Sequence, residues 1–372
     1  MKLAFYCNYL NHHQVLVADE LYKILGNEYC FVATLPRNVN ELKGGDDYSS
    51  RPYCILAGES DDARNYGMQL AREAETCIFG ACSQEYAVER AKQLDCGLSF
   101  EVAERWLKNG FLTIGSPVFR NWLKNYFVYY RKKKFYKLCS SAFAASDDNK
   151  MHIYKGRHFK WAYYSEVPES FPVHTETDTI RLMWCARFIA FKHPELAIKC
   201  SKRLADKGLN FHLDMYGDGE LRPKMEKLSE CWGLSELISF HGNIPNEKII
   251  ASMRESDVFL FTSDKKEGWG VVANEAMANG CVVLGRDCIG SVPYLINNSV
   301  DGFYFSDIDG LCEKIEWLIA NRAEMENMKK RAYESMRKLW NPYNAAKSLL
   351  YLINDINDGR ESSIQEGPCS KA

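Results

Sequence analysis

Short apolar runs bounded by turn residues alternate with amphipathic helical stretches along most of the chain, and the alternation occurs in two series. The first series begins with the runs KLAFYC and YCFVATL, and the second begins with IRLMWCARF and NFHLDMYGDG. A strand–helix–strand rhythm of this kind is typical of parallel sheets covered by helices. The sequence therefore predicts an α/β protein with two doubly wound, Rossmann-like halves.

The length of the chain fits two domains, because a single core rarely grows beyond about 250 residues and the chain has 372. The stretch YYSEVPESFPVHTETDT, with two prolines and several Ser and Thr residues, is typical of a linker. The expected boundaries are 1–165 for an N-terminal domain, 166–179 for the linker, 180–340 for a C-terminal domain, 341–358 for a helix that packs back on the N-terminal domain, and 359–372 for a polar, mobile tail.

Composition excludes several classes of protein. Lys and Arg number 47 against 49 Asp and Glu, so the net charge of -2 indicates no single charged partner. The N-terminus MKLAFYCNYLNHHQ lacks the apolar region of a signal peptide, and no run reaches the roughly 18 apolar residues of a membrane span. The fourteen cysteines are scattered without a CxxC pair, which is typical of reduced core residues. We therefore expect a cytoplasmic protein.

One segment departs from this charge balance. Residues 106–146 contain no acidic side chain, and the stretch 118–137 interleaves cations with aromatic residues. Such a stretch can lie on an anionic membrane surface, here the inner face, or hold an anionic acceptor. It can also be a solvated helix whose apolar side packs on the sheet. A nucleic-acid surface is the least favoured, because the rest of the chain shows no basic stripe. The basic residues are Lys108, Arg120, Lys124, Arg131, Lys132, Lys133, Lys134 and Lys137.

The fourteen residues EGWGVVANEAMANG, 267–280, carry two glutamates eight positions apart. Their glycines predict a turn followed by a helix from about Val271, so Glu267 lies on a loop after a strand and Glu275 lies inside the helix. Ligands of open α/β sheets bind at such loops, and the first N–H groups of the helix offer an anion site. Two carboxylates around an anion site suit a diphosphate with a sugar at one end and a ribose at the other. The alternative is a solvated Glu267 and a Glu275 paired on the helix surface.

Two cations follow the first strand of the second half. Arg187 and Lys192 face the same edge of the predicted sheet and are suited to neutralise a diphosphate leaving group. The alternative is that both form surface salt bridges. The next strand ends in MYGDGE, where the glycines predict a tight turn or a close approach of backbone.

Together these motifs resemble the retaining glycosyltransferases of the GT-B fold, specifically the GT4-type family with its E-x7-E signature. The resemblance covers residues 180–310 and includes HGNIPNEKI, SDVFLFTS and GSVPYLI, with Tyr294 where many members have glutamate. It implies a GT-B fold with two domains facing a central cleft. It also implies that the first glutamate contacts the donor sugar, the second the ribose, and the two cations the diphosphate. The implied catalytic residues are Glu267, Arg187 and Lys192, and the implied donor contacts are Gly217, Gly268, Trp269, Gly270, Val271 and Glu275.

The N-terminal half supplies candidates for the acceptor side. Its first loop reads NYLNHHQ, a form associated with bacterial polysaccharide glycosyltransferases, in place of the usual double glycine. His13 is a further catalytic candidate, although a His pair that opens a helix is as often structural. The histidine that the family has beyond the fourth or fifth strand has no obvious counterpart, and LSFEVAERW stands near its place. The acceptor-side candidates are Asn11, His12, Gln14, Glu101, Glu104 and Arg105.

The resemblance implies a retaining hexosyltransferase that moves a sugar from a nucleotide-sugar donor, with a UDP-sugar favoured, to a hydroxyl of a saccharide or lipid-linked saccharide in cell-surface polysaccharide or glycoconjugate biosynthesis. The donor is a substrate, so no cofactor is expected. Cations on the leaving group make a metal unnecessary, and the Asp-Asp pairs at 46–47, 61–62 and 147–148 are expected in polar loops. Two rivals are a nucleotide-sugar epimerase of the same architecture, disfavoured by the basic segment, and a non-catalytic nucleotide-sugar-binding protein, disfavoured by the intact set of charged residues.

Overall fold

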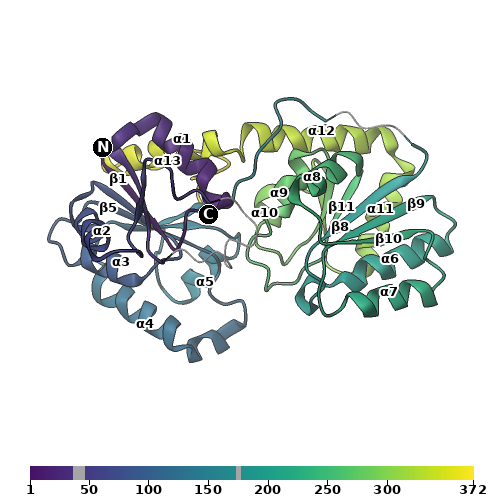
Figure 1. Ribbon diagram of the computed structural model, residues 1–372, viewed down its shortest axis with the longest axis horizontal. Helices are drawn as coiled ribbons and strands as arrows, with labels where there is room; N and C mark the ends of the chain where they lie inside the picture. The colour runs from purple at the N-terminus through teal and green to yellow at the C-terminus, as the bar shows by residue number, and fades with distance from the viewer. Residues whose placement is uncertain (37–46, 173–176) are drawn as a thin grey trace. The chain divides into compact units, whose positions relative to one another are not determined.

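The computed structural model describes residues 1–36, 47–172 and 177–372, which form two compact units. The first unit comprises Met1–Tyr164 and Pro342–Ala372, and the second comprises Ser165–Asn341 (Figure 1). Each unit has a parallel sheet with helices on both of its faces. The predicted α/β class with two Rossmann-like, doubly wound domains is confirmed.

The first unit has seven parallel strands in the order β3-β2-β1-β4-β5-β6-β7. The central strand β1 is buried along its whole length, which explains why the strands read as continuous apolar runs. The strand order reverses beside β1, and ligands of such sheets bind where it reverses, at the carboxyl ends of the strands. The strands are β1 (Leu3–Cys7), β2 (Tyr29–Ala33), β3 (Cys54–Leu56), β4 (Thr76–Phe79), β5 (Leu98–Ala103), β6 (Phe135–Cys139) and β7 (His158–Lys160).

The last helix of the chain belongs to the first unit. It lies beside the first helix, so the predicted return of the C-terminal helix is confirmed (Figure 1). Its buried residues Ala345, Leu349 and Leu352 follow the spacing of one helix face. The helices of this unit are α1 (His12–Leu25), α2 (Asp61–Glu73), α3 (Gln84–Ala91), α4 (Pro117–Asn125), α5 (Ala144–Lys150) and α13 (Pro342–Asn357), with the short turns η1 (Gly26–Glu28), η2 (Gly110–Gly115) and η3 (Tyr126–Tyr130).

The polar tail after α13 is not mobile, and this prediction was wrong. The backbone N–H of Lys160 donates to Ser370 O at 2.8 Å, and the N–H of Cys369 donates to Lys160 O at 2.7 Å. The tail therefore pairs with the edge strand β7, and the side chain of Cys369 is fully buried. Hydrogen bonds from the backbone at a sheet edge can fix a segment in place even where its polar side chains contribute little to packing.

The second unit has six parallel strands in the order β10-β9-β8-β11-β12-β13. The order reverses between β8 and β11, so the loops that follow these two strands are neighbours at the carboxyl edge of the sheet. The strands are β8 (Ile180–Cys185), β9 (Phe211–Tyr216), β10 (Ile238–Gly242), β11 (Val258–Phe261), β12 (Val282–Arg286) and β13 (Gly302–Phe305). The helices are η4 (Ala190–Lys192), α6 (Pro194–Asp206), α7 (Arg222–Cys231), α8 (Asn246–Glu255), α9 (Val272–Ala278), α10 (Val292–Leu295), α11 (Ile308–Ala320) and α12 (Arg322–Lys338).

Part of the predicted linker packs on the second unit. The hydroxyl of Tyr333 on α12 donates to Pro168 O at 2.7 Å, and its ring lies 5.5 Å from that of Phe171. Residues 173–176 of the linker lie outside the described residues. No helix in the described ranges is long and apolar enough to cross a membrane.

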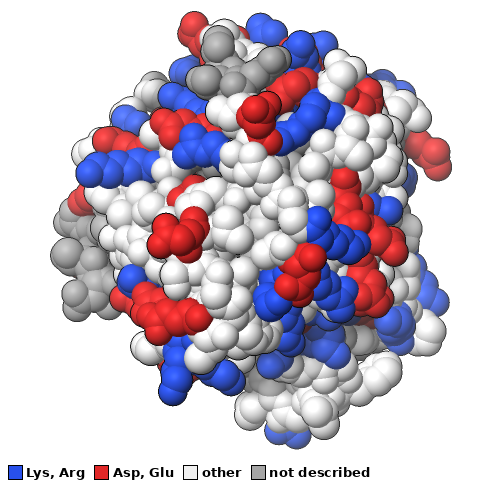
Figure 2. Space-filling model, turned by 90° about the vertical axis from the view of Figure 1, so that its right-hand side faces the viewer, with Lys and Arg blue, Asp and Glu red and all other residues white. Residues whose placement is uncertain are grey.

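Charges of both signs are intermixed on the face shown in Figure 2. Several pair between neighbouring elements of the second unit, as when Lys207, directly after α6, contacts Glu316 of α11 at 2.6 Å. Nucleic-acid-binding surfaces carry a stripe of one sign, so this face does not have the charge pattern of one.

Candidate functional site

The loops after β8 and β11 are joined by hydrogen bonds. Trp184 Nε1 donates to Thr262 Oγ1 at 2.9 Å, and Thr262 Oγ1 donates to Lys192 O at 2.7 Å. The N–H of Asp264 donates to Phe191 O at 2.8 Å. The two loops that carry most of the predicted donor residues therefore form one fixed wall.

Lys192 and Glu267 meet in this wall. The Lys192 ammonium contacts Glu267 Oε2, which also accepts a hydrogen bond from Ser263 Oγ at 2.9 Å. Their side chains are only 13% and 11% exposed, so Glu267 is not a solvated surface carboxylate. Arg187 is exposed instead and forms no ion pair with any residue in the described ranges. The structure thus pairs one predicted cation with a predicted carboxylate and leaves the other free.

Glu275 is a half-buried carboxylate inside α9. None of the described residues gives its carboxylate a hydrogen bond or an ion pair, and burial raises its pKa from 4.5 to about 7. Burial, and then the neighbouring Glu275, raise the pKa of the Cys185 thiol to about 12, while Lys192 lowers it, so all three lie near the end of β8. The alternative of a Glu275 paired on the helix surface is excluded. Buried carboxylates without partners are uncommon, and they mark candidate ligand sites.

The loop between the two glutamates needs glycine. Gly270 has a φ of +75°, and a Cβ there would lie 2.3 Å from the ring of Phe261. This turn ends the loop, and α9 begins at Val272, close to the predicted start. The side chain of Trp269 is buried and donates from Nε1 to Asn274 Oδ1 at 2.8 Å, so only its backbone can reach a ligand.

The glycine after β9 supports a neighbouring loop. Gly217 has a φ of +114°, and a Cβ there would lie 2.0 Å from Ala186 O. The N–H of Phe188 donates to Asp218 O at 2.9 Å in the same contact. The predicted close approach is therefore present, and the approaching chain is the loop that carries Arg187.

Tyr294 stacks on Trp340 in this unit, as part of an aromatic cluster.

The candidates after β1 take up different roles in the first unit. Asn11 caps α1, because its Oδ1 accepts from His13 N at 3.0 Å. The ring of His13 lies 5.7 Å from that of Tyr163, whose hydroxyl donates to Glu104 at 3.3 Å. Burial, helped by His12, lowers the pKa of His13 to about 4, so its imidazole is neutral at pH 7. His12 itself is exposed.

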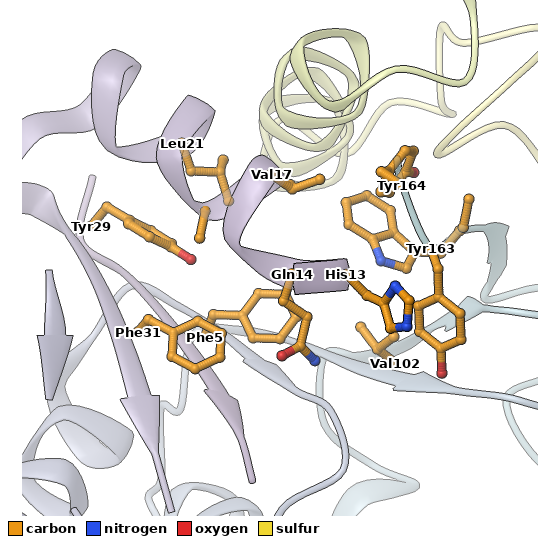
Figure 3. Close-up of a pocket in the computed structure, with 13 residues that line it drawn as sticks. Phe5, His13, Gln14, Val17, Leu21, Tyr29, Phe31, Val102, Tyr163 and Tyr164 are labelled. Carbon is orange, nitrogen blue, oxygen red and sulfur yellow. The ribbon is translucent and has the colours of Figure 1, made fainter. Parts of the chain in front are cut away.

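A narrow pocket lies between α1 and the sheet (Figure 3). Its walls are mostly apolar. Gln14 Nε2 donates to Cys7 Sγ at 2.9 Å, while its Oε1 and the hydroxyls of Tyr29 and Tyr164 are buried without a partner among the described residues. Figure 3 shows His13 and Tyr163 side by side at one end of this pocket.

The three candidates at and after β5 are held by other side chains. Arg105 forms a two-point ion pair with the buried Asp147, at 3.0 and 3.1 Å, and Glu104 contacts Lys108 at 2.5 Å. Glu101 accepts from the indole N–H of a tryptophan on α4 at 2.5 Å, and burial raises its pKa. The structure therefore links Glu104 to His13 through a tyrosine but directs Arg105 into a structural ion pair.

The expectation that the Asp-Asp pairs lie in polar loops was wrong for the pairs at 61–62 and 147–148, whereas Asp47 is exposed in a loop. Asp147 and Asp148 are buried in α5, and Asp148 pairs with Lys137 at 2.9 Å. Asp61 and Asp62 open α2. Asp46 lies outside the described residues.

Sequence reasoning missed three residues that hold the loops of the second unit and one that lies beside His13 in the first unit. Thr262 and Ser263 follow directly after the buried strand β11, and two polar residues at that point were a usable signal. Tyr163 was hidden in a stretch with the composition of a linker. Nothing in the sequence around Trp184 indicated that its indole would hold a loop.

The family model described as "Glycosyl transferases group 1" matches residues 145–335, just over half of the chain. Over 143 residues the chain is 26% identical to a putative colanic acid biosynthesis glycosyltransferase of Escherichia coli, covering 37% of this chain and 35% of that protein. Over 129 residues it is 29% identical to an amylovoran biosynthesis glycosyltransferase of Erwinia amylovora, covering 33% and 31%. The match thus spans about a third of the length of these relatives.

Two solved structures match nearly the whole length of this chain. HepE of Anabaena in complex with UDP has a TM-score of 0.68 at 12% identity, over 95% of this chain and 100% of that one. The lipopolysaccharide outer core galactosyltransferase WaaB has a TM-score of 0.68 at 14% identity, over 93% and 99%. Likeness at these identities establishes the fold, and the predicted GT-B fold is confirmed.

Proposed function

The chain belongs to the glycosyl transferases group 1 family, and from this premise we propose that it transfers a sugar from a nucleotide-sugar donor to an acceptor hydroxyl. The observation that carries the proposal is the half-buried, unpartnered carboxylate of Glu275 beside the pair of Lys192 and Glu267. These groups lie at the carboxyl ends of β8 and β11, where sheets of this kind bind ligands.

Glu275 is suited to bind the ribose of the donor. A carboxylate oxygen accepts hydrogen bonds from hydroxyls, and a diol that donates to it favours the charged form. Burial alone leaves Glu275 about half protonated at pH 7, so ribose binding would draw it to the carboxylate form. The nucleotide is proposed to be UDP, which is present in the structure of HepE.

Arg187 and Lys192 are proposed to bind the diphosphate. Negative charge grows on the leaving diphosphate as the bond to the sugar breaks, and fixed cations stabilise that charge. Arg187 is free to make a bidentate contact. Lys192 is held by its backbone bond from Thr262 and can share its ammonium between Glu267 and phosphate. Two cations perform this step without a metal.

Glu267 is proposed to orient the donor sugar. Its Oε2 is taken by Lys192 and Ser263, and its Oε1 has no hydrogen bond within the described ranges. One free carboxylate oxygen on a fixed side chain can accept from a sugar hydroxyl. With Glu275 this gives the E-x7-E arrangement of GT4-type enzymes, and the proposal includes the retention of configuration and the hexosyl transfer of that family.

The acceptor is proposed to be a saccharide or lipid-linked saccharide of cell-surface polysaccharide or glycoconjugate biosynthesis. The names of the relatives, which act in colanic acid and amylovoran biosynthesis, support this. His13 is the acceptor-side residue favoured in the first unit, because its neutral imidazole can exchange hydrogen bonds with a hydroxyl. All fourteen cysteines are free thiols, which supports the proposed cytoplasmic location.

A panel of UDP-, GDP- and ADP-sugars, each with and without oligosaccharide acceptors, tests the proposal. Nucleotide release that needs an acceptor is the expected result. Interconversion of the sugar without an acceptor would identify the rival epimerase, and binding without turnover would identify a non-catalytic binding protein. Glu275→Gln should lose activity, whereas Glu247→Gln, a change at an exposed glutamate on α8, should keep it.

A further inference from the structure

The aromatic face of α4 and η3 points into the first unit. Phe119, Trp122, Tyr126 and Tyr130 are buried at the spacing of one helix face. This inner face confirms that the apolar side of the basic segment packs on the fold. It accounts for the aromatic residues in the sequence motif and leaves the outer face to be explained.

The outer face of the same segment carries exposed apolar side chains. Phe111 is 63% exposed and Leu112 is 85% exposed, on η2 just before α4. Of the fourteen large apolar side chains exposed in the described part of the chain, six lie within residues 111–128, so they are clustered rather than scattered. We call these six the apolar ridge: Phe111, Leu112, Ile114, Val118, Phe127 and Val128.

The same segment carries exposed cations without an ion pair. Five basic side chains of the segment are exposed and form no ion pair with the residues that the structure describes: Arg120, Lys124, Arg131, Lys132 and Lys134. The other three are engaged. Lys108 pairs with Glu104, Lys133 donates to Gln93 O at 2.7 Å, and Lys137 is buried.

The acidic side chains of the neighbouring helix α3 are already paired. On α3, Glu85 pairs with Arg64 at 2.7 Å and Glu89 pairs with Arg72 at 3.2 Å. Figure 1 shows α3 and α4 on one side of the first unit, with α1 and α13 together on the other side. The ridge and its cations therefore lie within one short stretch of chain, residues 111–134, that exposes both apolar side chains and unpaired positive charge.

We propose that the apolar ridge and its five free cations dock on an anionic lipid bilayer. Apolar side chains enter the boundary between headgroups and acyl chains, while Lys and Arg bind lipid phosphates. Three of the five cations are lysines, which are depleted in protein–protein interfaces, so a bilayer fits this surface better than a protein partner. Docking deepens the proposed function by bringing the enzyme to a lipid-linked acceptor, but it does not require that transfer occurs.

Sedimentation of the full chain with vesicles tests the docking. The probes are vesicles of phosphatidylcholine alone and of phosphatidylcholine mixed with phosphatidylglycerol. We expect the protein to sediment with the mixed vesicles only. The double change Leu112→Ser and Phe127→Ser should lower the partition coefficient about tenfold or more. The double change Arg120→Gln and Lys124→Gln should lower it about 25-fold and flatten its dependence on salt.

A matched control is Ile24→Ser, a change at an exposed apolar residue on α1, which should sediment like the wild type. All variants should keep their circular dichroism and their nucleotide release with a soluble acceptor, which separates failure of docking from failure of the proposed function. Equal sedimentation of wild type and ridge variants would overturn the proposal. So would a wild-type dimer that the ridge variants abolish, because a second copy of the chain would then cover the ridge.

Discussion

Glu275→Gln is expected to stabilise the ligand-free protein while weakening nucleotide binding. The pKa of Glu275 is about 7 in the folded protein against 4.5 when the group is exposed. A difference of this size corresponds to about 3 kcal/mol at 1.36 kcal/mol per unit. Because the folded pKa is raised, ionisation of the carboxyl lowers the free energy of unfolding. This loss is absent below pH 4.5, grows as the pH rises to 7, and is constant above pH 7. The glutamine side chain of the variant is neutral at every pH, so the variant does not suffer this loss of stability.

Denaturant unfolding at pH 5, 7 and 8.5 measures the effect. The advantage of Glu275→Gln should be small at pH 5 and reach about 1 to 3 kcal/mol at pH 8.5, since the new amide also lacks a partner. Saturating UDP should stabilise the wild type by about 2.7 kcal/mol at 100 times its Kd, and the variant by much less. The control Glu247→Gln should change neither quantity. A variant that is no more stable than the wild type at pH 8.5, or that binds UDP equally well, would refute the reasoning.

Three further predictions concern the supports of the site. Gly270→Ala should cost about 1 to 3 kcal/mol of stability and weaken UDP binding, because its φ is positive and the new Cβ meets Phe261; unchanged thermal unfolding would contradict this. Thr262→Val should lower kcat more than it raises KM, because it frees the backbone of Lys192 while keeping the volume; unaltered kinetics would show that the bond has no positioning role. The His13 ring should show no NMR titration between pH 6 and 8, because its pKa is about 4; a midpoint near 6.5 would show that it is solvated.

The parts of the fold that depend on residues close together in the sequence could be predicted from the sequence. The strands and most helices follow from apolar periodicity, and α13 spans Pro342–Asn357, within one residue of the predicted 341–358 at each end. The turn between Glu267 and Glu275 follows from glycines that stand beside it in the chain. The prediction of a mobile tail was wrong because the tail is held by backbone hydrogen bonds to Lys160, which is far away in the sequence.

The contacts of the site depend on distant parts of the chain and could not be predicted. Lys192 and Glu267 were each identified as site residues, but their contact depends on how two loops end beside one another. Lys137 was counted with the surface cations, although it is buried with Asp148, because a lysine in a basic run looks solvated. The unpartnered state of Glu275 follows from packing alone.

Separate measurement of nucleotide affinity and transfer rate in Glu267→Gln and Glu275→Gln tests the central claim most directly. We expect Glu275→Gln to raise the Kd for UDP by tenfold or more, about 1.4 kcal/mol. We expect Glu267→Gln to keep that Kd within about threefold, about 0.7 kcal/mol, and to lower the rate of acceptor-dependent transfer. An equal loss of UDP affinity in both variants, or full transfer activity in either, would contradict the division of the two carboxylates between ribose and donor sugar.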